Sequence, residues 1–362
     1  MNRRIDRQAA FSGTREVSER LSIDATRLST FLERALAGFR APVRISQFKG
    51  GQSNPTYLIK AASGNYVLRR KPPGPLLPSA HAIEREYRVM HALGMQGFPV
   101  PNVHLLCEDE EIIGTPFYVM EEVAGRVIWE PHVPGVGTRE RGAIFAALNE
   151  TIARLHQFDP AALGLEDFGR PENYVARQIA RWSRQYAASA TDPIPQIDAL
   201  IAWLPQHVPQ QQRATLVHGD FRLDNVILAP DEPRIVAVLD WELATLGDPL
   251  ADFTYHLMQW VMPPSPLGAG VGSLLGHDLA TLGIPSLEDY AASYCEKTGI
   301  NVLPHLNFYL AYNFFRLAAI FQGIVARARS GNAANENAEA MASQVGPLAK
   351  VGWDYARRAG AI

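Results

Sequence analysis

The stretch HGDFRLDNVIL, residues 218–228, places several polar side chains where the sequence otherwise indicates buried chain. A second stretch of the same kind, VLDWELATLGDP, begins ten residues after the first one ends. Burying a polar group costs several kcal/mol unless a partner satisfies it. These side chains therefore either bond to one another or hold a ligand.

The two stretches predict a short β-hairpin that presents its polar groups at one end. Asn225 lies five residues after Asp220, so one loop can point both side chains inward, and Asp240 ends the second strand. Mg²⁺ binds through one or two carboxylates plus substrate phosphates. With Asn225 and Asp240 as metal ligands, Asp220 is free to accept a hydroxyl proton, which indicates a phosphoryl-transfer site. The alternative is a polar, helix-capping turn whose side chains bond to each other.

Composition narrows the class of protein. The chain has 362 residues, enough for two lobes, and its net charge of −3 gives no basic footprint for a nucleic-acid partner. Two cysteines, Cys107 and Cys295, predict no disulfide framework and no metal-ligand spacing. The most apolar stretch, residues 308–325, is interrupted by polar residues, which predicts a buried helix and no membrane partner. We therefore expect a reduced, cytoplasmic protein, with its oligomeric state left open.

Patterning along the chain predicts an α+β protein with two lobes. Residues 1–15 have the character of a disordered segment, and residues 24–38 predict a leading helix. Short or alternating apolar runs then predict about five antiparallel strands and one internal helix, with Ser79 as its N-cap. Later patterns are helical. We place an N-terminal lobe at residues 1–122 and a helical lobe at 123–362, with a cleft between them.

The two polar stretches resemble the catalytic and metal-binding loops of the aminoglycoside phosphotransferase family, small-molecule kinases related to protein kinases and choline kinases. The resemblance rests on HGDFRLDN and LDWELATLGDPLADF. It implies a protein-kinase-like fold with ATP and Mg²⁺ as cofactors, GTP remaining open. It also implies that Asp220 is the catalytic aspartate, Asn225 and Asp240 hold the metal, His218 braces the loop, and Asp248 caps the next helix.

The N-terminal lobe should then supply a nucleotide clamp. Gly50 and Gly51 lie in a turn between two strands, where backbone N–H groups can approach phosphates, although such a turn is also common in ordinary hairpins. We group Ser53 and Asn54 with this turn as nucleotide-binding residues. The Pro-rich loop from Lys71 to Ser79 receives no role.

The resemblance also suggests a cation for the phosphates and a carboxylate to orient it. Arg69 stands where most kinases carry lysine, and its planar guanidinium can grip a phosphate with two hydrogen bonds. Glu86 lies beside the apolar face of its helix whereas Glu84 lies on the polar face, so we choose Glu86 as the partner. For both residues the alternative is a solvated side chain. By analogy, backbone groups near Glu121 and Val123 meet the adenine.

The acceptor is expected to be a small hydroxyl compound. Only ELATLG separates Trp241 from Asp248, which leaves no room for a peptide-docking segment. From Pro249 onward, acidic and basic residues nearly balance, so a polycationic aminoglycoside is not favoured. Arg316, in the most apolar stretch, needs an anion, either an internal carboxylate or one on the substrate.

Nearly the whole chain resembles the kinase-like domains fused to acyl-CoA dehydrogenases, through GGQSNPTY, VLRRKPPGPLLPSAH and YNFFRLAAIFQG. This implies hydroxylated acyl compounds or their CoA thioesters as acceptors. Two alternatives stay open: an aminoglycoside kinase proper, and a pseudokinase that binds nucleotide without turnover.

Overall fold

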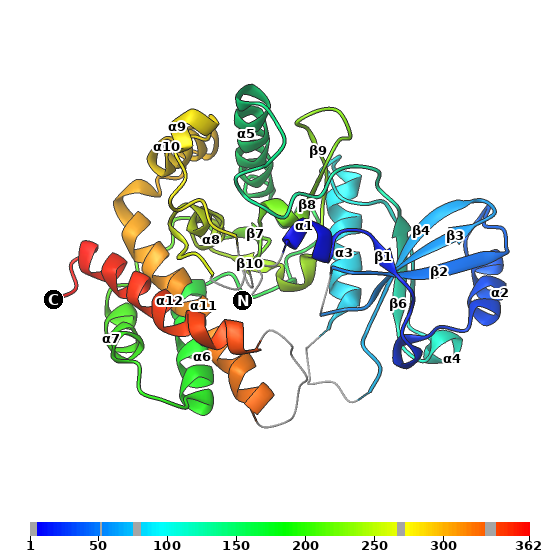
Figure 1. The fold of residues 1–362 in the computed structure, drawn as a ribbon, viewed down its shortest axis with the longest axis horizontal. Coiled ribbons are helices and arrows are strands. Elements are labelled where there is room, and N and C mark those ends of the chain that lie inside the picture. The colour runs from blue at the N-terminus through cyan, green and yellow to red at the C-terminus, as the bar shows by residue number, and fades with distance from the viewer. Residues whose placement is uncertain (1–5, 51–52, 75–80, 266–271, 330–337) are drawn as a thin grey trace.

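The structure is a computed structural model that describes residues 6–50, 53–74, 81–265, 272–329 and 338–362. A β-sheet lobe lies at one end of the molecule and a larger helical lobe at the other, which confirms the expected α+β architecture (Figure 1). The chain leaves the sheet after Glu121. The domain boundary between residues 122 and 123 stays a prediction.

The described residues contain one sheet of six strands, antiparallel throughout, in the order β1-β2-β3-β4-β6-β5. The strands are β1 (Thr14–Arg15), β2 (Val43–Phe48), β3 (Thr56–Ala61), β4 (Gly64–Arg70), β5 (Val103–Cys107) and β6 (Phe117–Glu121). The sequence predicted five of these strands. The sixth, β1, forms by pairing with the edge strand β2, with Thr14 opposite Phe48.

The expectation of disorder over residues 1–15 is wrong for residues 6–15. Helix α1 (Arg7–Phe11) begins after Asp6, whose carboxylate accepts the Ala9 N–H, and β1 follows it. Local sequence gave no sign of this order because long-range contacts create it, including the buried position of Arg7. Residues 1–5 lie outside the described residues.

Side chains alternate between the two faces of the sheet, and each face packs on a different partner. Leu68 and Val119 face α2 (Ala25–Ala35), within the predicted leading helix, in a small core of their own. Val67 and Met120 face α3 (Ile83–Met95) and belong to the main core, which continues through the helical lobe. Helix α3 therefore joins the two lobes through one continuous hydrophobic core (Figure 1).

The N-cap predicted for α3 is wrong. The helix begins after Ala82, which offers no capping side chain, and Ser79 lies outside the described residues. The helix is stabilised by packing of its buried face instead of by a capping side chain, because helix stability in proteins comes mostly from tertiary contacts.

The helical lobe surrounds two short antiparallel pairs of strands, of which only the second is a hairpin. β7 (Thr215–Val217) pairs with β10 (Thr245–Gly247), and β8 (Val226–Leu228) pairs with β9 (Ile235–Val238). The helices are α5 (Thr138–Leu155), α6 (Tyr174–Ser189), α7 (Pro195–Trp203), α8 (Pro249–Val261), α9 (Leu279–Leu282), α10 (Leu287–Thr298), α11 (Leu306–Arg329) and α12 (Ala338–Arg358), with the short α4 (Glu110–Ile113) in the sheet lobe. The expectation that the second lobe is mainly helical is confirmed.

Helix α11 is the central helix of this lobe. The segment Leu303–Arg329, which contains this helix, is long and apolar enough to cross a membrane, yet 89% of its most apolar window is buried inside the protein. It packs against α6, α8 and α12. As predicted from its polar interruptions, it is a core helix.

Candidate active site

The β8–β9 hairpin brings the polar groups of both motifs to one end. Val226 pairs with Val238, so the residues just outside this pair, Asn225 and Leu239, lie side by side, and the Leu239 N–H donates to the Asn225 carbonyl at 2.8 Å. The Asn225 amide nitrogen donates to the Asp220 carboxylate at 3.0 Å. Asp240 follows directly with a φ of 65°, the left-handed region that few non-glycine residues adopt. The predicted loop geometry is therefore present.

An ion network crosses from the sheet lobe to this hairpin. Arg69 places Nε 2.8 Å from Glu86 and Nη2 2.7 Å from Asp240. Burial alone would lower the pKa of Arg69, but Glu86 and Asp240 raise it above its ordinary value. Arg69 is thus a permanent cation at the junction of the lobes, and its contact with nucleotide phosphates stays a prediction.

Glu86, rather than Glu84, holds Arg69. Glu86 is 1% exposed and accepts hydrogen bonds from Asn54 at 2.7 Å and from the Tyr118 hydroxyl at 3.1 Å. Burial raises the pKa of Glu86, and Arg69 opposes that rise. Glu84 instead pairs with Lys71 at 3.0 Å near the surface. Asn54 therefore supports Glu86.

Asp252 braces the backbone beneath the catalytic-loop motif. Its carboxylate accepts the N–H of His218 at 2.7 Å and of Gly219 at 2.8 Å, and His156 Nε2 lies 3.1 Å from it. Burial favours a higher pKa for Asp252, but His156 and the backbone donor hold it below its usual range. Gly219 is required here, since its φ is 83° and a Cβ would lie 2.9 Å from the Leu243 carbonyl oxygen.

We expect Asp252→Asn to destabilise the fold by about 3 kcal/mol, because it places an amide donor against buried N–H groups and removes the charge facing His156. Urea unfolding at pH 7 measures the loss. Asp198→Asn, at an exposed position on α7, is the matched control and should change stability little. Equal stability of the two variants would contradict the bracing role.

The predicted supporting residues also take their places. His218 Nε2 lies 2.9 Å from the Leu239 carbonyl oxygen, which ties the motif to β9. Asp248 accepts the Leu250 N–H at 2.9 Å as the N-cap of α8 and accepts the Tyr309 hydroxyl at 2.6 Å. Both bracing roles are confirmed.

Asp220 lies among groups that adjust its charge. Arg222 Nε is 3.0 Å from its Oδ1, and the Tyr255 hydroxyl bonds to the same carboxylate. Burial raises the pKa of Asp220 above its usual value, and Arg222 opposes the rise. Arg316 donates to the Gly219 carbonyl at 2.9 Å and lies over the Tyr255 ring, so its partners are a carbonyl oxygen and a π-face.

A cleft of about 830 Å³ lies between the lobes. Among the predicted site residues it is lined by Gly50, Arg69, Glu121, Val123, Asn225 and Asp240. Gly51 lies outside the described residues. Ser53 bonds through its side chain to Glu242 beside Arg69. Asp220 is not among the residues that line this cleft, but its carboxylate accepts a hydrogen bond from Asn225, which does line it.

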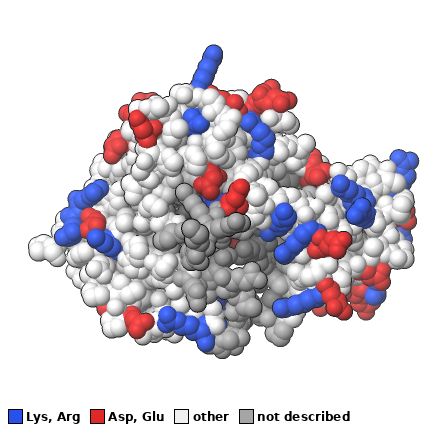
Figure 2. Space-filling view, in the orientation of Figure 1, with Lys and Arg blue, Asp and Glu red and all other residues white. Residues whose placement is uncertain are grey.

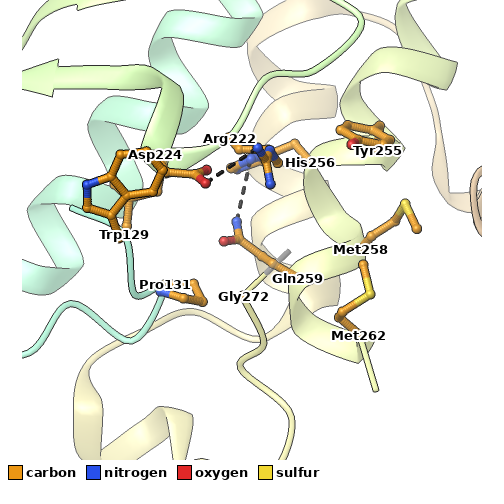
Figure 3. Close-up of a pocket in the computed structure, with 11 residues that line it drawn as sticks. Trp129, Pro131, Arg222, Asp224, Tyr255, His256, Met258, Gln259, Met262 and Gly272 are labelled. Atoms are coloured by element: carbon orange, nitrogen blue, oxygen red, sulfur yellow. Dashed lines mark hydrogen bonds and ion pairs between the residues drawn. The ribbon is translucent and has the colours of Figure 1, made fainter. Parts of the chain in front are cut away.

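A second, smaller pocket adjoins the cleft at the catalytic loop (Figure 3). Its walls combine Trp129, Met258 and Met262 with Arg222 and Asp224, and the two charged side chains point toward each other. Trp129 and Asp224 line the large cleft as well. The two spaces therefore share Trp129 and Asp224 as lining residues.

The model of the phosphotransferase enzyme family matches residues 44–286, about two thirds of the chain. The chain belongs to the phosphotransferase enzyme family. The match includes the hairpin motifs, Arg69 and Glu86. This match confirms the resemblance to the aminoglycoside phosphotransferase family that the motifs indicated.

Curated relatives of this phosphotransferase-family chain are larger proteins. Acyl-CoA dehydrogenase family member 10 of Mus musculus is 45% identical over 349 residues, covering 96% of this chain and 32% of the relative. Acyl-CoA dehydrogenase family member 11 of Homo sapiens is 41% identical over 349 residues, covering 95% of this chain and 44% of the relative. The chain thus spans less than half the length of these relatives. The likeness to kinase-like domains of acyl-CoA dehydrogenase proteins is confirmed.

Solved structures confirm the kinase-like fold. A protein of Ralstonia eutropha JMP134, provisionally assigned as an aminoglycoside phosphotransferase, is 44% identical with a TM-score of 0.83, covering 93% of this chain and 99% of that one. Choline kinase of Cryptosporidium parvum Iowa II is 10% identical with a TM-score of 0.61, covering 93% and 97%. This second likeness concerns the fold alone.

Sequence reasoning missed two carboxylates of this family member. Glu242 lies 3.6 Å from Arg69, and burial together with Asp240 raises its pKa to about 7. It was treated as part of a spacer, although an acid two residues after Asp240 was a usable signal. Asp252 received no role from the sequence, because the backbone N–H groups that it binds lie more than thirty residues away.

The small pocket also contains a buried histidine that predicts acid sensitivity. Burial lowers the pKa of His256 to about 4, below its usual value of about 6.5. The neutral ring is favoured in the folded state, so stability is full above pH 6.5 and is lost as the pH falls toward 4. The loss should reach about 3 kcal/mol.

We expect His256→Gln to remove most of this acid-dependent loss. Urea unfolding at pH 7.5 and at pH 4.5 checks it, with His91→Gln on an exposed position of α3 as the control. A wild-type protein whose pH dependence matches that of His256→Gln would contradict the assignment.

Proposed function

We propose that the chain is an ATP- and Mg²⁺-dependent phosphotransferase that moves the γ-phosphate to a hydroxyl of a small molecule. The observation that carries the proposal is the cross-lobe arrangement in which Arg69, Glu86 and Asp240 lie at one side of the cleft. Asn225 lines the same cleft and donates to the Asp220 carboxylate. A phosphate-gripping cation, metal ligands and a proton acceptor are the parts that phosphoryl transfer requires.

The donor atoms fit a magnesium ion. Arg69 contacts Oδ1 of Asp240, and Asn225 uses its amide nitrogen on Asp220, so each metal-binding candidate keeps an oxygen for a cation. Hard oxygen ligands of this kind suit Mg²⁺, which neutralises phosphate charge when bound. Gly50 and the hinge residues Glu121 and Val123 line the place proposed for the nucleotide.

Asp220 would orient the acceptor hydroxyl and take its proton. The O–H bond breaks as the oxygen bonds to the γ-phosphorus, and the bond from that phosphorus to the bridging oxygen of ADP breaks. A raised pKa brings the carboxylate closer to the operating pH, which suits proton transfer. The Asn225 amide holds the Asp220 carboxylate in place.

The proposed acceptor is a hydroxylated acyl compound or its CoA thioester. The cleft between the lobes, with a volume of about 830 Å³, would receive it, because the small pocket offers only about 20 Å³. The names of the curated relatives support this choice of acceptor. Asp224, which lines both spaces, pairs with Arg222 and Arg7 and so offers no free negative charge to a polycation. On the face seen in Figure 2, acidic and basic side chains are interspersed.

Transfer of labelled phosphate from ATP tests the proposal across hydroxyacyl-CoAs, choline-like alcohols and aminoglycosides, with Asp220→Ala as the blank. Turnover of a hydroxyacyl-CoA supports it. Turnover of an aminoglycoside alone would instead identify an antibiotic kinase. Mg-ATP binding without transfer to any acceptor would identify a pseudokinase. The cytoplasmic location and the absence of nucleic-acid and membrane partners stay predictions.

A further inference from the structure

The segment from Asp6 to Arg15 connects both lobes at the mouth of the cleft (Figure 1). Its strand pairs with the edge of the sheet lobe. Its helix contacts the chain just beyond the hinge, where the Gln8 side chain donates to the Val127 carbonyl at 3.0 Å and accepts the Trp129 N–H at 3.2 Å. A five-residue helix has little stability of its own, so these contacts fix its place.

The segment also forms a wall of the proposed nucleotide site. Gln8 and Phe11 line the cleft, and the Phe11 ring lies 5.0 Å from the Trp129 ring. A Cβ on Gly50 would lie 3.2 Å from Trp129. The N-terminal helix, the hinge-proximal tryptophan and the predicted phosphate turn are thus in close contact.

Arg7 extends from this helix into the catalytic loop. It is 6% exposed, and its Nη2 lies 3.4 Å from Asp224 Oδ2. The same oxygen lies 3.4 Å from Arg222, whose Nε lies 3.0 Å from Asp220. Four alternating charges therefore lead from the N-terminal helix to the proposed proton acceptor.

The surroundings of Arg7 leave it little freedom. A Cβ on Gly272 would lie 2.8 Å from Arg7 Nη1 and 2.4 Å from Pro131. Burial lowers the pKa of Arg7, and Asp224 opposes the change. Burying an arginine carries a large desolvation cost, and here its ion-pair partner belongs to the catalytic loop.

We propose that Arg7 is a positioning residue for phosphate transfer, acting through Asp224 on Arg222 and so on Asp220. This rests on the proposed function. Arg7 neutralises Asp224 and leaves Arg222 free to hold Asp220. Without Arg7, Asp224 draws Arg222 toward itself, and the Asp220 carboxylate loses its fixed direction.

Amide hydrogen exchange tests the positioning without any turnover. We compare wild type with Arg7→Met, Arg7→Lys and Arg15→Met, the last an exposed arginine of the same segment. Arg7→Met should speed exchange across residues 219–225 about tenfold, with partial recovery in Arg7→Lys and no change in Arg15→Met. Urea unfolding first confirms that the Arg7 variants are folded. An unchanged exchange rate over residues 219–225 in folded Arg7→Met would overturn the proposal.

A double-mutant cycle with Asp224→Asn tests the route of the effect. Using the acceptor that the screen identifies, Arg7→Met should lower kcat about tenfold and change KM for ATP less than twofold. When Arg7→Met is combined with Asp224→Asn, kcat should fall no further than in Asp224→Asn alone, because both substitutions act through one ion pair. Additive losses would overturn the route through Asp224. A wild-type protein that phosphorylates no acceptor refutes the proposed function, while hydrogen exchange still decides the positioning.

Discussion

Replacing Asp220 with alanine should lower phosphate transfer about 10³-fold, because no other carboxylate in the described part of the chain is placed to take the hydroxyl proton at the proposed acceptor site. Asp224 pairs with Arg7 and Arg222, and Asp240 pairs with Arg69. Transfer of labelled phosphate from ATP measures the loss in kcat.

Nucleotide affinity should stay nearly intact in Asp220→Ala, since Asp220 is not among the residues that line the cleft and the proposed nucleotide contacts remain. Calorimetric titration with Mg-ATP measures it. Asp220→Asn keeps the shape and most of the packing, so it separates loss of the proton acceptor from loss of the side chain. Transfer by Asp220→Asn at the wild-type rate would refute the assignment.

Replacing Asp240 with asparagine should lower kcat at least about 10²-fold and weaken the apparent affinity for Mg²⁺. The variant keeps an amide oxygen but removes the negative charge of one of the two ligands proposed for the metal. It also converts the 2.7 Å ion pair with Arg69 into a contact with a neutral group, so the cation at the lobe junction loses a charged partner.

Varying Mg²⁺ at fixed ATP separates these two consequences. Rescue of much of the rate by high Mg²⁺ indicates a metal-binding defect, whereas a low rate at saturation indicates displacement of Arg69. Asp231→Asn, at the exposed turn of the same hairpin, should leave both quantities unchanged. An Asp240→Asn enzyme with wild-type kcat and Mg²⁺ dependence would contradict the proposed ligand set.

The sequence predicted those features that local spacing determines. The separation of Asp220, Asn225 and Asp240 around two short strands was enough to anticipate the hairpin and its grouped oxygens. The choice of Glu86 over Glu84 followed from helical periodicity, because only one of them adjoins the apolar face. Strand alternation likewise predicted the antiparallel sheet.

The features that the sequence analysis missed depend on contacts between distant segments. Arg7 meets Asp224 across 217 positions, and no periodicity or motif links them. The bracing role of Asp252 depends on backbone N–H groups, which have no sequence signature. Strand β1 has two residues, too few for a pattern, and its order comes from pairing with β2.

The continuous core through α3 limits how this protein can be recombined with its relatives. A chimera joined between residues 122 and 123 would take α3 residues such as Met90 and Leu93 from one parent. Other members of the same core, such as Phe145 and Trp241, would come from the other parent. Mismatched volumes there would strain or hollow the interior of the hybrid. To exchange nucleotide specificity between relatives, α3 and the surfaces of the helical lobe that enclose it must therefore be taken from the same parent protein.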